Sequence, residues 1–80
     1  MKITVGNVVT IFDETIEETA TFTLVAQDKS NLSEGKLSVF SPLGASLLGL
    51  KLGDRAKVSI FQRSSSFLVL MIGSLQNHPE

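Results

Sequence analysis

The feature that most constrains this chain is the strict alternation of side chains in residues 19–26. Ala20, Phe22 and Leu24 would share one face of an extended chain, and the opposite face would carry two threonines and a valine. A period of two is typical of a strand with one covered face. The chain is therefore predicted to build a sheet that packs on a core from one side.

Four further segments have strand character. Val8–Phe12 is rich in β-branched and aromatic residues, and Lys36–Phe40 and Arg55–Phe61 alternate between apolar and polar side chains. Phe67–Gly73 is apolar on both faces, which is typical of a strand in the interior of a sheet. The polar segment Gln62–Ser66 is predicted as the turn of an antiparallel hairpin between the last two strands.

Two polar segments connect the first three strands. Residues 13–18 suit a hairpin turn, and Gln27–Gly35 is predicted as a loop that ends in a glycine. The acidic residues of the first segment lack the glycine and the terminal glutamate of a calcium loop, so we interpret them as a solvated turn. They are Asp13, Glu14, Glu17 and Glu18.

One stretch interrupts the strand pattern and predicts a short helix between Ser41 and Gly49. Ser41 is a favourable N-cap, and Pro42 would take the first helical position, where an N–H has no partner within the helix. Leu43 and Leu47 lie four residues apart on one helix face. Two turns are unstable alone, so these leucines are expected to pack on the sheet, and Gly49 is placed to end the helix in the left-handed conformation.

Composition limits the classes of protein that this chain can be. It has 80 residues and no cysteine, so disulfides and thiolate metal sites are excluded and packing alone must stabilise the domain. The net charge of −1 supplies no field that attracts nucleic acid, and direct nucleic-acid binding is not expected. No segment approaches the roughly 20 apolar residues of a membrane span, and no secretory signal is visible. We expect a cytoplasmic protein without membrane contact.

These patterns together predict one α+β domain over residues 1–80. It consists of an antiparallel sheet of about five strands with one short helix packed against it. The single histidine, His78, lies three positions from the end and is interpreted as part of a frayed tail. We expect no catalytic residue, no metal and no cofactor.

The segment Leu37–Asp54 resembles the C-terminal domain of the bacterial GreA/GreB transcript cleavage factors, and more closely Rnk, the regulator of nucleoside diphosphate kinase, which is of the same family. The resemblance extends over nearly the whole chain. It implies an FKBP-like fold, a curved antiparallel sheet with one helix across it. The shared motif residues are Ser38, Val39, Ser41, Pro42, Leu47, Leu48, Gly49, Gly53 and Asp54.

The resemblance also implies a partner. In GreA and GreB this domain docks on RNA polymerase through the β′ subunit, at the rim of the secondary channel. The loop between the third strand and the helix carries much of that contact. Mapped residue by residue, the partner-binding loop here is Val39, Phe40, Ser41, Pro42 and Leu43.

The chain departs from the family pattern in three places. The N-terminal coiled coil that carries acidic residues into the polymerase is missing, so transcript cleavage is not expected. Phe40 stands where the Gre factors typically carry Asn or Asp. The last hairpin has Gln62, Arg63 and Ser64 in place of the usual Pro-Gly-Gly turn.

Several alternatives stay open. Phe40 is either a hydrophobic anchor for a partner or a core residue. The domain could be a general interaction module that forms a homodimer through an edge strand or through Phe40. A prolyl isomerase would need an aromatic-lined pocket, and the chain has five phenylalanines but no tryptophan or tyrosine. The leading hypothesis is an RNA polymerase-binding domain that modulates transcription elongation without cleaving RNA.

Overall fold

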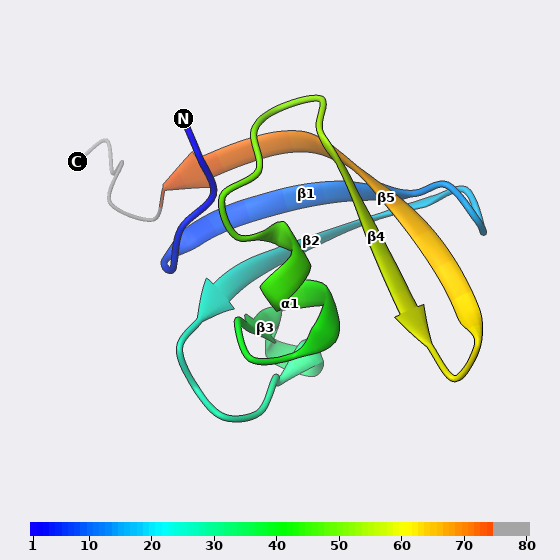
Figure 1. The fold of residues 1–80 in the computed structure, drawn as a ribbon. Coiled ribbons are helices and arrows are strands. Elements are labelled where there is room, and N and C mark those ends of the chain that lie inside the picture. Colours follow the sequence, from blue (N-terminus) through cyan, green and yellow to red (C-terminus); the bar gives the residue numbers. More distant parts are fainter. Residues whose placement is uncertain (75–80) are drawn as a thin grey trace.

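The structure, a computed structural model, describes residues 1–74 as a single curved sheet with α1 in its concave side (Figure 1). The strand order in the sheet is β3-β2-β1-β5-β4. None of the helices in these 74 residues is long and apolar enough to cross a membrane. The elements are β1 (Asn7–Asp13), β2 (Glu18–Val25), the 3-10 helix η1 (Leu32–Glu34), β3 (Lys36–Ser38), α1 (Pro42–Leu47), β4 (Arg55–Ile60) and β5 (Arg63–Ser74).

The sheet is mixed, so the prediction of a wholly antiparallel sheet is wrong for β3. β3 runs parallel to β2, whereas β1–β2, β1–β5 and β4–β5 are antiparallel. The connection leads back along β2 to Asn31, which exchanges two backbone hydrogen bonds with Lys36. The η1 turn and Gly35, whose φ is 73°, then reverse the chain before β3 begins. Alternation identifies the buried face of a strand but not its direction, so the sequence pattern could not show this reversal.

The β4–β5 hairpin is antiparallel as predicted, but its turn is shorter than Gln62–Ser66. Ile60 pairs with Arg63, so only Phe61 and Gln62 form the turn. Their φ angles are 49° and 65°, which corresponds to a type I′ turn. The serine run belongs to β5 instead, because its three residues pair with Ser59, Val58 and Lys57 of β4 in the antiparallel ladder.

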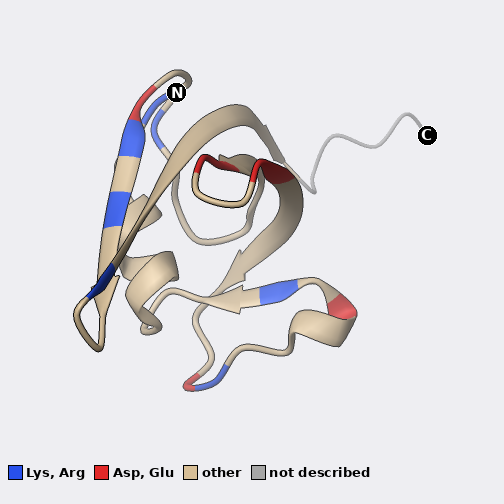
Figure 2. Ribbon diagram, turned by 90° about the vertical axis from the view of Figure 1, so that its right-hand side faces the viewer, with Lys and Arg blue, Asp and Glu red and all other residues tan. Residues whose placement is uncertain are grey.

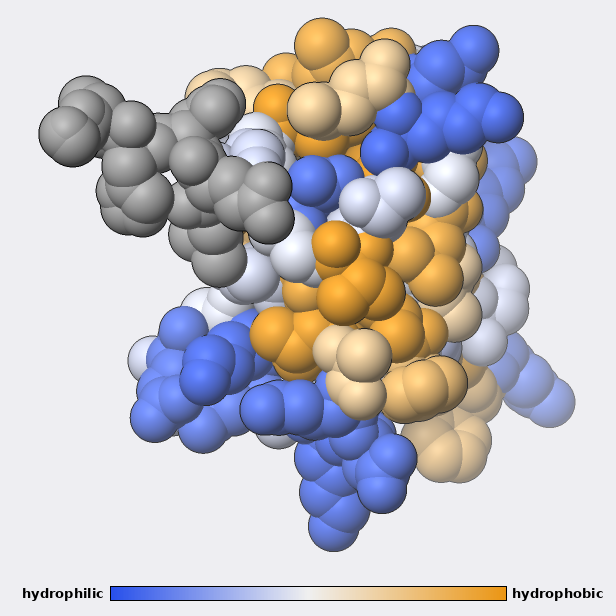
Figure 3. Space-filling model, turned by 90° about the vertical axis from the view of Figure 1, so that its left-hand side faces the viewer, coloured by the Kyte–Doolittle hydropathy of each residue, from blue (hydrophilic) through white to orange (hydrophobic). Residues whose placement is uncertain are grey.

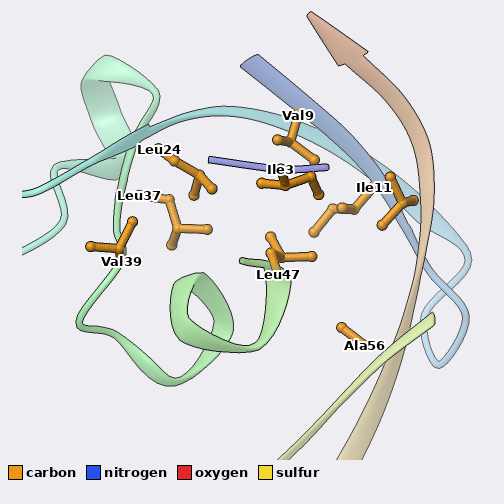
Figure 4. Close-up of a cluster of buried hydrophobic side chains, with 9 residues drawn as sticks. Ile3, Val9, Ile11, Leu24, Leu37, Val39, Leu47 and Ala56 are labelled. Atoms are coloured by element: carbon orange, nitrogen blue, oxygen red, sulfur yellow. The ribbon is translucent and has the colours of Figure 1, made fainter. Parts of the chain in front are cut away.

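The buried core lies between α1 and the concave side of the sheet. The face of β2 that the alternation marked as apolar points inward, and β5 lies between β1 and β4 as an interior strand. Leu47 projects from α1 toward the strands (Figure 4) and is fully buried, a contribution of about 1.5–3 kcal/mol. The core residues are Ile3, Val9, Ile11, Leu24, Leu37, Val39, Leu47, Ala56 and Val69.

The helix begins where the sequence predicts and ends slightly earlier. Ser41 is the N-cap and Pro42 is the first helical residue. Gly49 follows the helix with a φ of 84°, as expected for a residue that ends a helix in the left-handed region. Its N–H donates to the carbonyl oxygen of Ile3 at 2.9 Å, which fastens the N-terminal segment to the end of α1.

Candidate functional site

Ser38, at the end of β3, organises the junction between the sheet and α1. It is buried, and its hydroxyl donates a hydrogen bond to the carbonyl oxygen of Gln27 while accepting one from the backbone N–H of Phe40 at 3.0 Å. Its own N–H donates to the hydroxyl of Ser30 at 2.8 Å. The backbone at Phe40 is therefore held in place by a satisfied polar side chain beneath it.

The first turn of α1 is bonded to the same residue. The carbonyl oxygen of Ser38 accepts hydrogen bonds from the N–H of Ser41 at 3.1 Å and from its hydroxyl at 2.6 Å. That hydroxyl also accepts from the N–H of Gly44 at 3.1 Å, as an N-cap does. A Cβ at Gly44 would overlap the carbonyl oxygen of Ser38, so this approach of helix to strand requires glycine.

The structure places the five residues of the predicted partner-binding loop at three depths. Phe40 is 68% exposed and Pro42 is exposed beside it. Ser41 and Leu43 are half-buried, and Val39 is part of the core. The ring of Phe40 therefore lies outside the core, and the interpretation of Phe40 as a core residue is wrong. Its role as a partner anchor stays a prediction, and Val39 can act only by supporting its neighbours.

An apolar groove adjoins this loop. Leu43, on the first turn of α1, lines a cavity of about 510 Å³ whose other walls come from β4 and β5. Alternation along β4 and β5 places the lining residues of these two strands on the same face of the hairpin as the core residue Ala56, and α1 contacts β4. The loop and the groove form one surface that shares Leu43. The remaining lining residues are Val58, Ile60, Phe61, Arg63, Ser65 and Phe67.

Sequence reasoning missed Phe61 as a surface residue. It was expected at the end of a strand, but it lies in the hairpin turn and its side chain is 94% exposed. The only available signal was the end of the β4 alternation at Ile60, which leaves Phe61 and Gln62 as a two-residue hairpin connection. We name Phe61, Gln62 and Arg63 the hairpin tip.

Arg63 is the one charged residue among those that line the groove. Figure 2 shows Lys and Arg along β4 and the hairpin, while Asp and Glu gather at the β1–β2 turn. Glu14, in that turn, accepts a hydrogen bond from Arg55 at 3.0 Å and one from Ser66 at 2.8 Å. The bond from Arg55 first, and then the bond from Ser66, lower the pKa of the Glu14 carboxyl, and the carboxylate raises the pKa of Arg55.

The acidic turn has its own structural work. The Asp13 side chain accepts a hydrogen bond from the N–H of Thr15 at 2.9 Å, as in the turn predicted from the sequence. Within residues 1–74, no three His, Cys, Asp or Glu side chains gather where they could hold a metal ion. His78 lies outside the described residues.

Apolar surface is also present away from the groove, as a band of hydrophobic side chains on another face (Figure 3).

Comparison with known proteins gives the same family as the sequence motif. Residues 1–74 match the family described as "Transcription elongation factor, GreA/GreB, C-term". The transcription elongation factor GreA of Pelobacter propionicus is 39% identical over 59 residues, which are 74% of this chain and 37% of that protein. GreA of Christiangramia forsetii is 39% identical over 71 residues, 89% of this chain and 45% of that protein. The chain thus spans less than half the length of these relatives.

Solved structures support the same grouping. The GreA factor homolog 1 (Gfh1) protein of Thermus thermophilus superposes with a TM-score of 0.74 and 28% identity, covering 92% of this chain and 49% of that one. The GreA/GreB elongation factor of Nitrosomonas europaea gives 0.69 and 25%, covering 89% and 59%. The predicted outline of five curved strands and one helix is confirmed by this likeness.

Proposed function

This chain belongs to the GreA/GreB C-terminal domain family of transcription elongation factors, and we propose that it binds RNA polymerase. The docking surface is Phe40, Pro42 and Leu43 together with the adjoining groove. The contact on the polymerase is the β′ subunit at the rim of the secondary channel, as the family resemblance implies. The domain then works in the bacterial cytoplasm, where that polymerase is found.

The observation that carries this proposal is the exposure of Phe40 and Pro42 on a backbone that cannot easily rearrange. The hydroxyl of Ser38 accepts a hydrogen bond from the N–H of Phe40. The hydroxyl of Ser41 joins the carbonyl oxygen of Ser38 to the N–H of Gly44. A preorganised loop loses little conformational entropy when it binds. An exposed aromatic residue at the centre of an interface can supply a large share of the binding energy.

The domain modulates elongation by occupying its place on the polymerase, and it is not an enzyme in this proposal. The loop and groove present apolar and hydroxyl-bearing side chains and one arginine, and no carboxylate is among them. In the β1–β2 turn, Asp13 and Glu14 are engaged in hydrogen bonds within the fold. Such a surface suits docking and competition with other factors that bind the same rim, and it supplies no group for transcript cleavage.

A binding experiment tests the docking surface. Purified bacterial core RNA polymerase is titrated into the fluorescently labelled chain, and the Kd of Phe40→Ala is compared with that of the wild type. We expect a loss of about tenfold or more, which is about 1.4 kcal/mol or more, because the proposal makes Phe40 a hot spot of the interface. Ile16→Ala is the matched control, because Ile16 is 60% exposed in the β1–β2 turn. Absence of wild-type binding contradicts the proposal.

A transcript assay tests the mode of action. The chain is added to halted elongation complexes with and without a full-length GreA protein. We expect no RNA cleavage by the chain alone and slower cleavage by GreA in its presence, because both would occupy the same rim. Cleavage by the chain alone, or unchanged cleavage by GreA at saturating chain, contradicts occupancy as the mechanism.

A further inference from the structure

The hairpin tip combines two features that folding alone does not favour. Phe61 and Gln62 both have positive φ. This conformation costs an L-residue roughly 1–2 kcal/mol, and Asn and Gly adopt it most readily. Phe61 also exposes 94% of a large apolar side chain. A strained turn that displays an aromatic ring is the kind of outlier from which a functional role can be inferred.

The tip also forms one end of the apolar groove. Phe61 and Arg63 line it opposite Leu43, so a partner seated on the docking loop and along the groove would reach the tip. Within residues 1–74, the ion pairs join Lys36 to Glu34 and Arg55 to Glu14, and neither involves Arg63. An arginine at the edge of an apolar groove has five N–H donors suited to a carboxylate.

We propose that Phe61 and Arg63 recognise a polymerase segment that presents an apolar side chain next to a carboxylate, which Phe61 covers and Arg63 pairs with. This proposal rests on the proposed function and names the chemistry of the partner at one end of the same surface. The tip would then add selectivity to the contact made at Phe40 and Pro42, because apolar segments without the carboxylate would leave Arg63 unpaired.

A protein segment fits this surface better than a nucleic acid. The residues that line the groove are mainly apolar, and Arg63 is the single cation among them, whereas a groove that follows a nucleic-acid strand is positively charged along its length. Single-stranded RNA would also meet a chain whose net charge is −1. A second copy that docked tip to tip across a two-fold axis would bring Arg63 against another Arg63, which the charge disfavours.

The first experiment separates the ring of Phe61 from the strain of its backbone. Phe61→Asn keeps a residue that accepts positive φ, so it should raise the Tm by about 4 °C or leave it unchanged, yet weaken binding to core RNA polymerase about tenfold. Gln62→Gly is the matched control, because it relieves the neighbouring strain and leaves the ring in place. It should raise the Tm with an unchanged Kd.

The second experiment isolates the charge. Arg63→Gln should weaken polymerase binding several-fold at about 0.05 M salt and much less at about 0.5 M, since screening already weakens the ion pair there. Lys57→Gln removes the same charge from the opposite face of the hairpin, because Lys57 alternates with the core residue Ala56 and the groove residue Val58. Lys57→Gln should leave both the Kd and its salt dependence unchanged.

The outcomes distinguish this proposal from the proposed function. Absence of wild-type binding to the polymerase overturns both. Wild-type binding that Phe40→Ala weakens and Phe61→Asn does not overturns the role of the tip alone. If Arg63→Gln and Lys57→Gln raise the Kd equally, the charge at Arg63 acts only through long-range electrostatics, which overturns the proposed role of the tip. So does a dimer in sedimentation that Phe61→Asn dissociates, or binding of a single-stranded RNA oligonucleotide that Arg63→Gln abolishes.

Discussion

The two walls of the groove are built in opposite ways. On the junction wall, Ser38 and Ser41 bond the end of β3 to the start of α1, and Gly44 allows the two backbones to touch. On the hairpin wall, Phe61 and Gln62 adopt a strained turn in which the large side chain faces solvent. The two walls meet the same cavity, with Leu43 on one side and Phe61 on the other.

The difference shows where local structure serves folding and where it serves the surface. Substitutions that remove polar atoms or add volume should damage the junction wall, because its polar atoms are joined by part-buried hydrogen bonds and Gly44 leaves no room for a Cβ. Substitutions that relax the backbone should stabilise the hairpin wall, because its conformation is unfavourable for the residues it carries. Stability measurements on the two walls should therefore have opposite signs.

The largest effect is expected for Gly44→Ala. The added methyl group would overlap the carbonyl oxygen of Ser38, a backbone atom held by two hydrogen bonds, and we expect a loss of about 3 kcal/mol or more in the free energy of unfolding. Urea denaturation followed by circular dichroism measures it. Gly73→Ala is the control, because its Cβ would meet Val8 at an ordinary contact distance. Equal stability of the two variants would contradict the close approach of α1 to β3.

The next largest effect is expected for Ser38→Ala. The change removes the buried hydroxyl that accepts from the N–H of Phe40 and donates to the carbonyl oxygen of Gln27, and it leaves these two part-buried backbone groups without that partner. We expect a loss of about 2 kcal/mol in the free energy of unfolding. Ser59→Ala should lose no more than about 0.5 kcal/mol, since Ser59 is exposed. A loss at Ser38 no greater than at Ser59 would show that the junction does not depend on this hydroxyl.

The junction wall is the part of the site that the sequence predicted well. Ser41, Pro42 and Gly49 are residues whose backbone preferences are strong enough to mark a helix start and end without tertiary information. The resemblance to the GreA/GreB family added the docking loop. The alternation over Lys36–Phe40 places Leu37 and Val39 on one face, and both are buried, but it could not show whether Phe40 is exposed, because β3 already ends at Ser38.

The hairpin wall and the direction of β3 were the parts that sequence reasoning missed. A serine run is typical of a turn, yet in β5 it faces β4 across an antiparallel ladder, so tertiary pairing overrides the local preference. The reversal before β3 depends on the bridge between Asn31 and Lys36, a pairing within a polar loop that no periodicity reports. Ile3, a core residue, was also missed, because it lies in an irregular N-terminal segment where no periodicity marks the buried side chains.

A gain in stability is expected on the hairpin wall for Gln62→Gly. Glycine adopts a φ near 65° without the steric penalty of a Cβ, so the free energy of unfolding should rise by about 0.5–1 kcal/mol. Thermal denaturation measures the change. Ser64→Gly is the control, because glycine within a strand should lower stability by about 0.5–1 kcal/mol. A loss at Gln62 comparable to that at Ser64 would show that the turn is not strained.

The smallest effect concerns the root of the hairpin, where Arg55 and Ser66 bond to Glu14 and fasten the hairpin to the β1–β2 turn. Because these bonds, Arg55 first, hold the pKa of Glu14 below its ordinary value of 4.5, the unfolded chain takes up this proton at a higher pH than the folded chain. The stabilisation is therefore complete above pH 4.5 and is lost as the pH falls through the lower pKa of the folded state. The difference in Tm between the wild type and Glu14→Gln should therefore shrink as the pH falls through that acidic range. The difference in Tm between the wild type and Arg55→Gln should shrink in the same way. Lys57→Gln is the control, and its difference in Tm from the wild type should not change over this range. A Tm difference that stays constant between about pH 7 and 3 would mean that the ion pair of Glu14 and Arg55 does not stabilise the root of the hairpin.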